Sequence, residues 1–228
     1  MEVGALVAAA GQGTRLGETL PKAFVELEGR PLLWWTVSAL ARSPHIGSLT
    51  VAVPAGCVER ASDALREIRA FPIRVVEGGA TRQESVYRAL RSSPEHWALV
   101  LVHDAARPFV SPRLVEDCIH AAAELEAVVA ALPVTDTIKE VDSSGKVLRT
   151  LDRVRLRAVQ TPQVFRRSLL AEAHERARQE GYRATDDAAL VERLGRPVWV
   201  VRGSRENRKI TTPEDLDWAR SRLRRAPR

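Results

Sequence analysis

Short apolar runs alternate with amphipathic segments along most of this chain. Runs of β-branched and small apolar residues predict strands at Val3–Ala9, Leu49–Val53, Ile73–Val76, Ala98–Val102, Val128–Leu132 and Val198–Val201. Apolar residues at helical spacing predict helices at Leu32–Arg42, Val58–Arg69, Arg82–Arg91, Pro112–Leu125, Arg167–Glu180, Ala188–Leu194 and Pro213–Leu223. Strands that alternate with helices are typical of an α/β fold whose mostly parallel sheet is covered on both faces.

The alternation stops once, in the region 136–153. Two β-like segments, Thr137–Val141 and Val147–Leu151, are joined by Asp-Ser-Ser-Gly, which is a hairpin signal. Because a two-stranded ribbon is marginally stable alone and leaves its edges unpaired, we expect it to fold back on the core or to pair with another subunit. The chain shows no repeat, low-complexity stretch or linker, so we predict a single domain, 1–228, with a protruding β-hairpin arm at about 136–153.

Composition narrows the class of protein. The 228 residues suffice for one α/β core without disulfide staples. The two cysteines lie far apart in no metal-binding spacing, which favours free thiols in a reducing compartment. The five histidines form no H-x-x-x-H pair, so no structural zinc site is predicted. Because no apolar run approaches the ~20 residues that span a bilayer and no signal peptide is evident, we expect a cytoplasmic protein without a membrane partner.

The net charge is +6, and arginine supplies most of the positive charge. A basic surface attracts nucleic acid or small anions, but no aromatic stacking platform or recognition helix is evident. We therefore expect small anionic partners and no nucleic acid. Lysine is scarce, and of the few lysines Lys22 and Lys209 both fall within motifs.

The most informative stretch is 4–22, GALVAAAGQGTRLGETLPK. A predicted strand leads into a loop that contains Gly11, Gly13 and Gly17. Glycine permits positive φ and close approach of backbone N–H groups, which form a concave anion site. Arg15 and Lys22 place two cations at the rim of that loop. The pattern predicts a site that holds a polyphosphate and stabilises the charge that develops as a bond breaks.

Two common phosphate-binding motifs do not fit this loop. The Walker motif requires lysine after its last glycine, whereas Gly17 is followed by Glu18. In the dinucleotide fingerprint the third glycine would come one residue earlier, and no acidic ribose-binding residue is evident. Neither motif explains Pro21 and Lys22, so a nucleotide-binding dehydrogenase is disfavoured.

Other candidate residues follow predicted strands or open helices. Asp104 ends an apolar run, where a carboxylate can hold Mg²⁺ against phosphate oxygens or cap the next turn. Gly78 and Gly79 follow another strand. They fit a loop that is pressed against a flat ligand, and they fit an ordinary strand-to-helix turn equally well. Thr185 precedes a helix, where it can act as an N-cap or contact an anion.

The motif A-A-G-x-G-x-R-L-G followed by P-K resembles the signature of nucleotidyltransferases that couple a nucleoside triphosphate to a phosphorylated sugar or alcohol. Further segments resemble one branch, the 2-C-methyl-D-erythritol 4-phosphate cytidylyltransferases of the non-mevalonate isoprenoid pathway. These segments, in family order across nearly the whole chain, are Gly78-Gly79 with Arg82 and Ser85, 103–108 (HDAARP), 135–137 (TDT), 161–163 (TPQ), 185–186 (TD), and Lys209 before 212–215 (TPED).

The resemblance implies a Rossmann-like three-layer nucleotidyltransferase fold that joins CTP to the polyol phosphate with Mg²⁺. It implies catalytic roles for Arg15, Lys22, Asp104 and Lys209, with Asp104 at the metal. It implies CTP contacts at Ala9, Ala10, Gly11, Gly13, Gly79, Ser85 and Ala105, and acceptor contacts at Thr137, Arg153, Thr161, Thr185 and Arg107. It also implies a homodimer in which the arm brings Arg153 to the partner's site.

Three alternatives stay open at this stage. A sister cytidylyltransferase acting on ribitol 5-phosphate would share the fold and the chemistry. A nucleotide-binding regulatory module or an RNA-binding module would keep the pocket without the reaction.

This chain departs from the family pattern at one position. The family branch often has an acidic residue where this chain has Ala80, which indicates a weakened or re-routed contact to the base.

Overall fold

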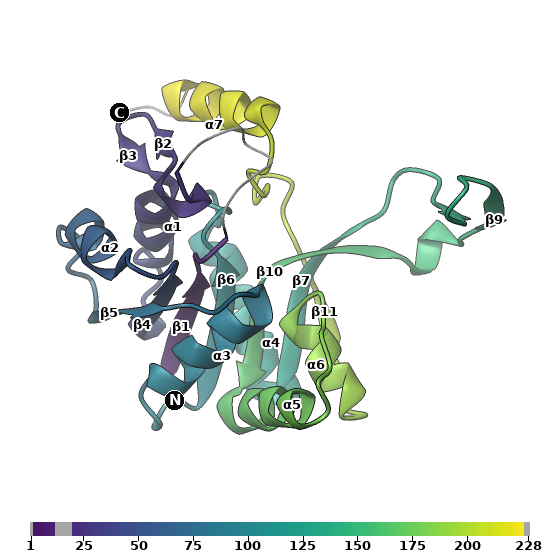
Figure 1. Cartoon of the computed structure of the whole chain (residues 1–228), viewed down its shortest axis with the longest axis horizontal. Coiled ribbons are helices and arrows are strands. Elements are labelled where there is room, and N and C mark those ends of the chain that lie inside the picture. Colours follow the sequence, from purple (N-terminus) through teal and green to yellow (C-terminus); the bar gives the residue numbers. More distant parts are fainter. Residues whose placement is uncertain (1, 12–19, 226–228) are drawn as a thin grey trace.

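The computed structural model describes residues 2–11 and 20–225 (Figure 1). Its strands are β1 (Val3–Ala8), β2 (Glu26–Leu27), β3 (Arg30–Pro31), β4 (Ile46–Val53), β5 (Ile73–Glu77), β6 (Leu99–Asp104), β7 (Ala127–Pro133), β8 (Lys139–Val141), β9 (Val147–Thr150), β10 (Arg157–Arg166) and β11 (Trp199–Arg202). Its α-helices are α1 (Leu32–Leu40), α2 (Val58–Leu65), α3 (Arg82–Ser92), α4 (Pro112–Leu125), α5 (Arg167–Gln179), α6 (Asp187–Arg193) and α7 (Pro213–Arg225). Short 3₁₀ turns occur at η2 (Lys22–Phe24) and η3 (Arg153–Arg155).

A seven-stranded sheet in the order β11-β7-β10-β6-β1-β4-β5 forms the centre of the molecule. β1 pairs in parallel with both β4 and β6, and β4 pairs in parallel with β5. β11 is parallel to β7. The carboxyl ends of β1, β4, β5 and β6 therefore meet at one edge of the sheet. This arrangement confirms the α/β fold with a mostly parallel sheet.

Helices cover both faces of this sheet because successive strand residues point to opposite sides. In β1, Ala5 and Val7 pack into one buried cluster, whereas Leu6 packs into another. The first cluster includes Leu33 of α1 and Val115 of α4. The second contains residues of the helices on the other face, α3, α5 and α6, such as Val86, Leu170 and Leu190. The result is the three-layer arrangement that the sequence resemblance implied.

Strand β10 was not predicted from the sequence. It lies antiparallel between β6 and β7, in the middle of the sheet, and it contains Pro162. Proline argues against a central strand because it cannot donate a ladder hydrogen bond. The pairing of β10 with β7 shifts register between Val159 and Gln163, and this irregularity accommodates the proline.

The C-terminal helix packs on the segment that follows the glycine loop (Figure 1). A third buried cluster joins Val25, Leu27 and Leu32 to Ile210, Leu216 and Ala219. The Ile210 N–H also donates to the Ala106 carbonyl at 2.8 Å. Together these contacts hold the residue before Ile210, Lys209, beside the loop that follows β6.

The arm projects away from the sheet (Figure 1). β8 and β9 form a separate two-stranded antiparallel sheet, which confirms the predicted hairpin. At its turn, Asp142 Oδ1 accepts hydrogen bonds from the backbone N–H groups of Ser144 and Lys146. Gly145 has φ +86°, a conformation that glycine adopts readily. Apolar side chains are exposed along the arm at Val141, Val147, Leu148 and Val154.

Candidate active site

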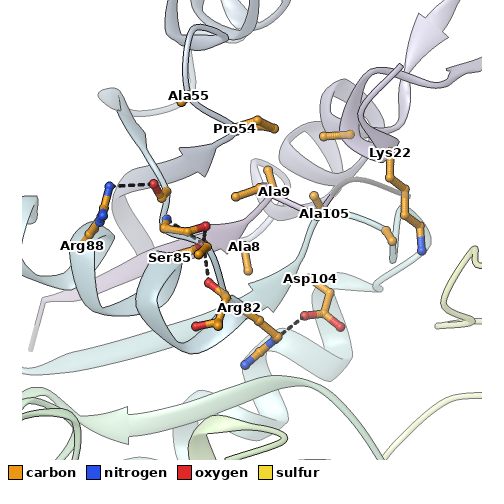
Figure 2. A pocket seen from close by; sticks show the side chains of 18 of the residues that line it. Ala8, Ala9, Lys22, Pro54, Ala55, Arg82, Ser85, Arg88, Asp104 and Ala105 are labelled. Atoms are coloured by element: carbon orange, nitrogen blue, oxygen red, sulfur yellow. Dashed lines mark hydrogen bonds and ion pairs between the residues drawn. The ribbon is translucent and has the colours of Figure 1, made fainter. Parts of the chain in front are cut away.

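A cavity of about 670 Å³ opens at the carboxyl edge of the parallel strands (Figure 2). Its walls are the loops that follow β1, β4, β5 and β6, together with η2 and the segment before α7. Open α/β sheets bind ligands at this edge. The residues that line it are Ala8, Ala9, Ala10, Gly11, Lys22, Ala23, Pro54, Ala55, Gly78, Gly79, Ala80, Thr81, Arg82, Ser85, Arg88, Asp104, Ala105, Ala106, Lys209 and Thr211.

Most of the residues predicted to act in catalysis or CTP binding line this cavity. They are Ala9, Ala10, Gly11, Lys22, Gly79, Ser85, Asp104, Ala105 and Lys209. Two predicted residues, Gly13 and Arg15, lie outside the described residues. The structure therefore brings lysines from the two ends of the chain, Lys22 and Lys209, to one cavity.

Asp104 lies among three cationic side chains. Its Oδ1 is 3.0 Å from Arg82 Nε, and its Oδ2 is 2.7 Å from Lys209 Nζ and 3.8 Å from Arg107 Nε. Burial alone raises the pKa of this carboxyl, but Arg82 and Lys209 outweigh burial and hold its pKa well below its usual range. Asp104 is therefore a carboxylate at neutral pH.

Arg82 links Asp104 to a second buried carboxylate. Its Nη1 group donates to Asp187 Oδ2 at 2.7 Å, and Asp187 Oδ1 lies 3.2 Å from His174 Nε2. Burial raises the pKa of Asp187, but Arg82 and His174 more than offset it and lower this pKa. Because two carboxylates hold one guanidinium from both sides, Arg82 has a defined position at the cavity wall.

His103 and Thr161 orient the backbone beneath Asp104. His103 Nε2 lies 3.1 Å from the Arg107 carbonyl, so Nε2 carries the proton and donates. Nδ1 is then an acceptor and receives the Thr161 hydroxyl at 3.0 Å, while that hydroxyl accepts the Asp104 N–H at 3.0 Å. Complete burial lowers the pKa of His103 to about 4, consistent with this neutral tautomer.

Thr161 and Arg107, both predicted to contact the acceptor, lie just behind the cavity and do not line it. Arg107 donates to the Asn207 carbonyl at 2.8 Å, and Asn207 Nδ2 donates to the Thr161 carbonyl at 2.7 Å. These bonds join the loop after β6, strand β10 and the segment that carries Lys209. Thr161 and Arg107 therefore contact other residues of the protein, and these contacts position Asp104 and Lys209.

The Gly78-Gly79 turn is tightly packed. A Cβ atom on Gly78 would come within 2.6 Å of the Ala10 Cβ, so glycine allows the loops after β1 and β5 to touch. The Gly79 N–H donates to Ser85 Oγ at 3.1 Å, and that hydroxyl donates to the Thr81 carbonyl at 2.7 Å. The Ala80 N–H donates to Glu84 Oε2 at 3.0 Å. The turn therefore presents backbone groups at a fixed position on the cavity wall.

The three remaining predicted acceptor contacts are not part of the cavity lining. Arg153 lies on the arm, where its Nη1 group donates to the Thr135 carbonyl at 2.6 Å. Thr137 lies at the base of the arm, and Thr185 is exposed before α6. Asp186, rather than Thr185, caps α6 by accepting the Ala189 N–H at 3.1 Å. Within one chain the arm does not reach the cavity, so the roles of these residues stay predictions.

Several lining or supporting residues were not predicted. Pro54 and Ala55 line the cavity directly after β4, and the rule that ligands bind at the carboxyl ends of strands points to them. Asp187 and Asn207 carried no signal, because aspartate at a helix start and asparagine in a loop are common. Their roles depend on which distant residues they meet.

A family model described as IspD, 2-C-methyl-D-erythritol 4-phosphate cytidylyltransferase, matches residues 3–225. The chain belongs to this family. An IspD-family relative, the 2-C-methyl-D-erythritol 4-phosphate cytidylyltransferase of Desulforamulus reducens, is 43% identical over 223 residues, which cover 97% of this chain and 95% of the relative.

Solved structures of the IspD family show the same fold. The crystal structure of the 2-C-methyl-D-erythritol 4-phosphate cytidylyltransferase from Thermus thermophilus is similar with a TM-score of 0.81 at 42% identity, covering 98% of this chain and 100% of that one. The 4-diphosphocytidyl-2C-methyl-D-erythritol synthase from Anaerococcus prevotii has a TM-score of 0.87 at 32% identity, covering 98% and 99%. The resemblance seen in the motifs is confirmed, and the chain is a nucleotidyltransferase.

Proposed function

We propose that the chain transfers the cytidylyl group of CTP to 2-C-methyl-D-erythritol 4-phosphate, giving 4-diphosphocytidyl-2-C-methyl-D-erythritol and pyrophosphate in isoprenoid precursor synthesis. Membership of the IspD family over residues 3–225 supports the reaction. The observation in the structure that carries it is the convergence of Lys22, Lys209 and Asp104 on one cavity at the strand ends. The relatives and structures named above offer no support for ribitol 5-phosphate as the acceptor.

The chemistry requires positioning and charge stabilisation more than an activated side chain. An acceptor phosphate oxygen is itself the nucleophile that attacks the α-phosphorus of CTP, and pyrophosphate leaves. Lys22 and Lys209 neutralise the phosphate charge that develops, as Arg15 does from the glycine loop. The turn at Gly78-Gly79 faces the base and ribose, and its carbonyl oxygens can accept hydrogen bonds from them, whereas its N–H groups donate to Val53, Ser85 and Glu84.

Mg²⁺ fits the residues of this cavity. Asp104 remains ionised, and a single carboxylate together with substrate phosphates is a common way to bind Mg²⁺. Lys209, its partner at Oδ2, has a side chain that is 39% exposed and flexible enough to turn toward a phosphate. Asp104 would hold the ion, which neutralises triphosphate charge when bound.

We further propose that the molecule is one domain with an arm and works as a homodimer. Exposed apolar side chains on the two-stranded arm favour burial against a second copy. In that dimer, Arg153 and Thr137 contact the acceptor phosphate in the partner's cavity. Thr185, which precedes α6, contacts the same phosphate.

A cytoplasmic location fits the free thiols of Cys57 and Cys118. Among the described residues, no helix has the length and apolar character to cross a bilayer.

Pyrophosphate release tests the proposed reaction. The purified protein is assayed with each of the four nucleoside triphosphates against 2-C-methyl-D-erythritol 4-phosphate, ribitol 5-phosphate and the two dephosphorylated alcohols. We expect release only with CTP and 2-C-methyl-D-erythritol 4-phosphate. Faster release with ribitol 5-phosphate would overturn the acceptor assignment, and nucleotide binding without release would favour a regulatory module.

A further inference from the structure

Three side chains of the types that can bind metals meet on the surface of α4, outside the catalytic cavity. Glu116 and His120 are one helical turn apart on α4, so their side chains share a face. His45, from the segment between α1 and β4, lies across from them. The Nε2 atom of His45 is 3.2 Å from Glu116 Oε1, and the three ligand atoms all lie within 4.8 Å of one another.

The spacing matches what a bound metal requires. Around a tetrahedral Zn²⁺ with bonds near 2.0–2.1 Å, neighbouring ligand atoms are separated by about 3.4 Å. The separation between His45 and Glu116 is close to this value, and the ring of the exposed His120 already lies within 4.8 Å of both ligand atoms. The rings of His45 and His120 are edge-to-face, with centroids 5.3 Å apart, so they are not stacked against each other.

We propose that His45, Glu116 and His120 form a binding site for a divalent transition metal such as Zn²⁺. Two imidazoles and one carboxylate suit Zn²⁺, Co²⁺ or Ni²⁺ better than Mg²⁺, which prefers oxygen ligands. Three protein ligands leave coordination positions for water. None of these residues lines the catalytic cavity. The bound metal tethers the segment before β4 to α4 and stabilises the fold without taking part in nucleotidyl transfer.

Within the described ranges of the chain, a second histidine–carboxylate pair on the surface, His96 with Glu2, lacks the third ligand that the cluster on α4 has. His96 Nε2 lies 2.9 Å from Glu2 Oε1, which is an ordinary histidine–carboxylate contact. In the part of the chain that the structure describes, no further histidine, cysteine or carboxylate joins that pair within ligand distance, whereas His120 joins His45 and Glu116. The pair at His96 therefore provides a matched control for the three-ligand site.

The experiment uses the untagged full chain after treatment with a chelator. Calorimetric titration with Zn²⁺ is expected to give one site per chain, and Co²⁺ is expected to give visible absorption bands typical of nitrogen and oxygen ligands. Zn²⁺ at about 100-fold above its dissociation constant should raise the melting temperature by roughly 5–10 °C. His45→Ala, His120→Ala and Glu116→Gln should each abolish the bands and the stabilisation, whereas His96→Ala should retain both.

Two further variants test whether the metal binds elsewhere on the protein instead of at the proposed site. Cys57→Ser removes the partly exposed thiol, and Asp104→Asn removes the carboxylate of the catalytic cavity. We expect the Co²⁺ bands to survive in both. Bands that persist in His120→Ala, or that vanish in Cys57→Ser or Asp104→Asn, would overturn the proposal, as would an absence of stoichiometric binding. Mg²⁺-dependent turnover should be unchanged in His120→Ala, and this outcome is independent of which acceptor the enzyme uses.

Discussion

The ammonium group of Lys209 lies 2.7 Å from the Asp104 Oδ2 oxygen, although the two residues come from distant parts of the chain. The contact holds a cation at the cavity and balances the charge of a buried carboxylate. In the proposed reaction the same ammonium turns to the phosphates of the substrates. This pair joins the C-terminal segment to the edge of the central sheet.

Replacing either cavity lysine should slow the reaction strongly. Loss of one preorganised charge contact costs about 3–4 kcal/mol of transition-state stabilisation, which is roughly 10²–10³ in turnover. We expect this loss for Lys22→Met and Lys209→Met, with both variants folded and with a lower melting temperature for Lys209→Met, because Asp104 loses one of its compensating cations. Arg220→Met, which removes an exposed cation on α7, is the control. Turnover within a few-fold of the parent in either lysine variant would contradict the assigned roles.

Activity should require a divalent ion and depend on the charge of Asp104. Asp104→Asn keeps the shape of the side chain and removes its negative charge. We expect turnover at least about 100-fold lower and a higher Mg²⁺ concentration for half-activation. Rates are measured across a Mg²⁺ series, below the melting temperature of the variant. An unchanged Mg²⁺ dependence and an unchanged rate would show that Asp104 has a structural role only.

Asp187 should be a stability determinant of the cavity wall. Asp187→Asn removes the charge that pairs with Arg82 in a buried setting. Arg82 keeps its second partner, Asp104, so the expected cost is that of one lost hydrogen bond between charged groups in a buried setting, about 1.5–3 kcal/mol. Urea unfolding measures the loss. The exposed pair of Asp217 with Arg220 is the control, since Asp217→Asn should change stability by less than about 1 kcal/mol. Equal losses in the two variants would contradict the prediction.

The buried, neutral His103 should make stability depend on pH in the mildly acidic range. Its folded-state pKa is about 4, below the value near 6.5 of an unfolded chain. Below pH 6.5 the unfolded state binds a proton that the folded state does not, so this contribution is fully present above pH 6.5 and is lost as pH falls toward 4. The expected loss is about 3 kcal/mol.

The variant His103→Gln tests this assignment, because its amide keeps one donor and one acceptor and does not titrate. Unfolding free energies are measured by urea denaturation from pH 7 to pH 4. The variant should be less stable at pH 7 and show a flatter slope across this range. A slope equal to that of the parent would show that other groups cause the pH dependence.

Subunit mixing should reveal a shared site. If each cavity takes Lys22 from one chain and Arg153 from the other, a mixed dimer of Lys22→Ala and Arg153→Ala subunits has one site with both defects and one intact site. We therefore expect mixing to restore activity toward half the parental value per mixed dimer. Failure of rescue despite demonstrated subunit exchange would refute the crossed site, and a monomeric protein at working concentration would refute the arm's role.

Local sequence pattern was enough to predict the α/β fold and much of the cavity. Asp104 and the residues after β1 were found because they follow predicted strands, and parallel strands end at one edge, whereas Gly79 was named from the family resemblance. The hairpin was found from its turn residues. Strand β10 escaped prediction because Pro162 masks its pattern, and only its partners β6 and β7 on either side stabilise it as a central strand.

By itself, then, the sequence determined the order of the helices and of the central-sheet strands other than β10, the glycine loop and the family signature, because these depend on neighbouring residues and their periodicity. Only the tertiary structure decided that Asp187 holds Arg82 against Asp104, that Thr161 supports the backbone of Asp104, and that His45 meets Glu116 and His120. Such contacts depend on how helices and strands pack and in which register. No spacing along the chain encodes them, because the partners come from separate elements.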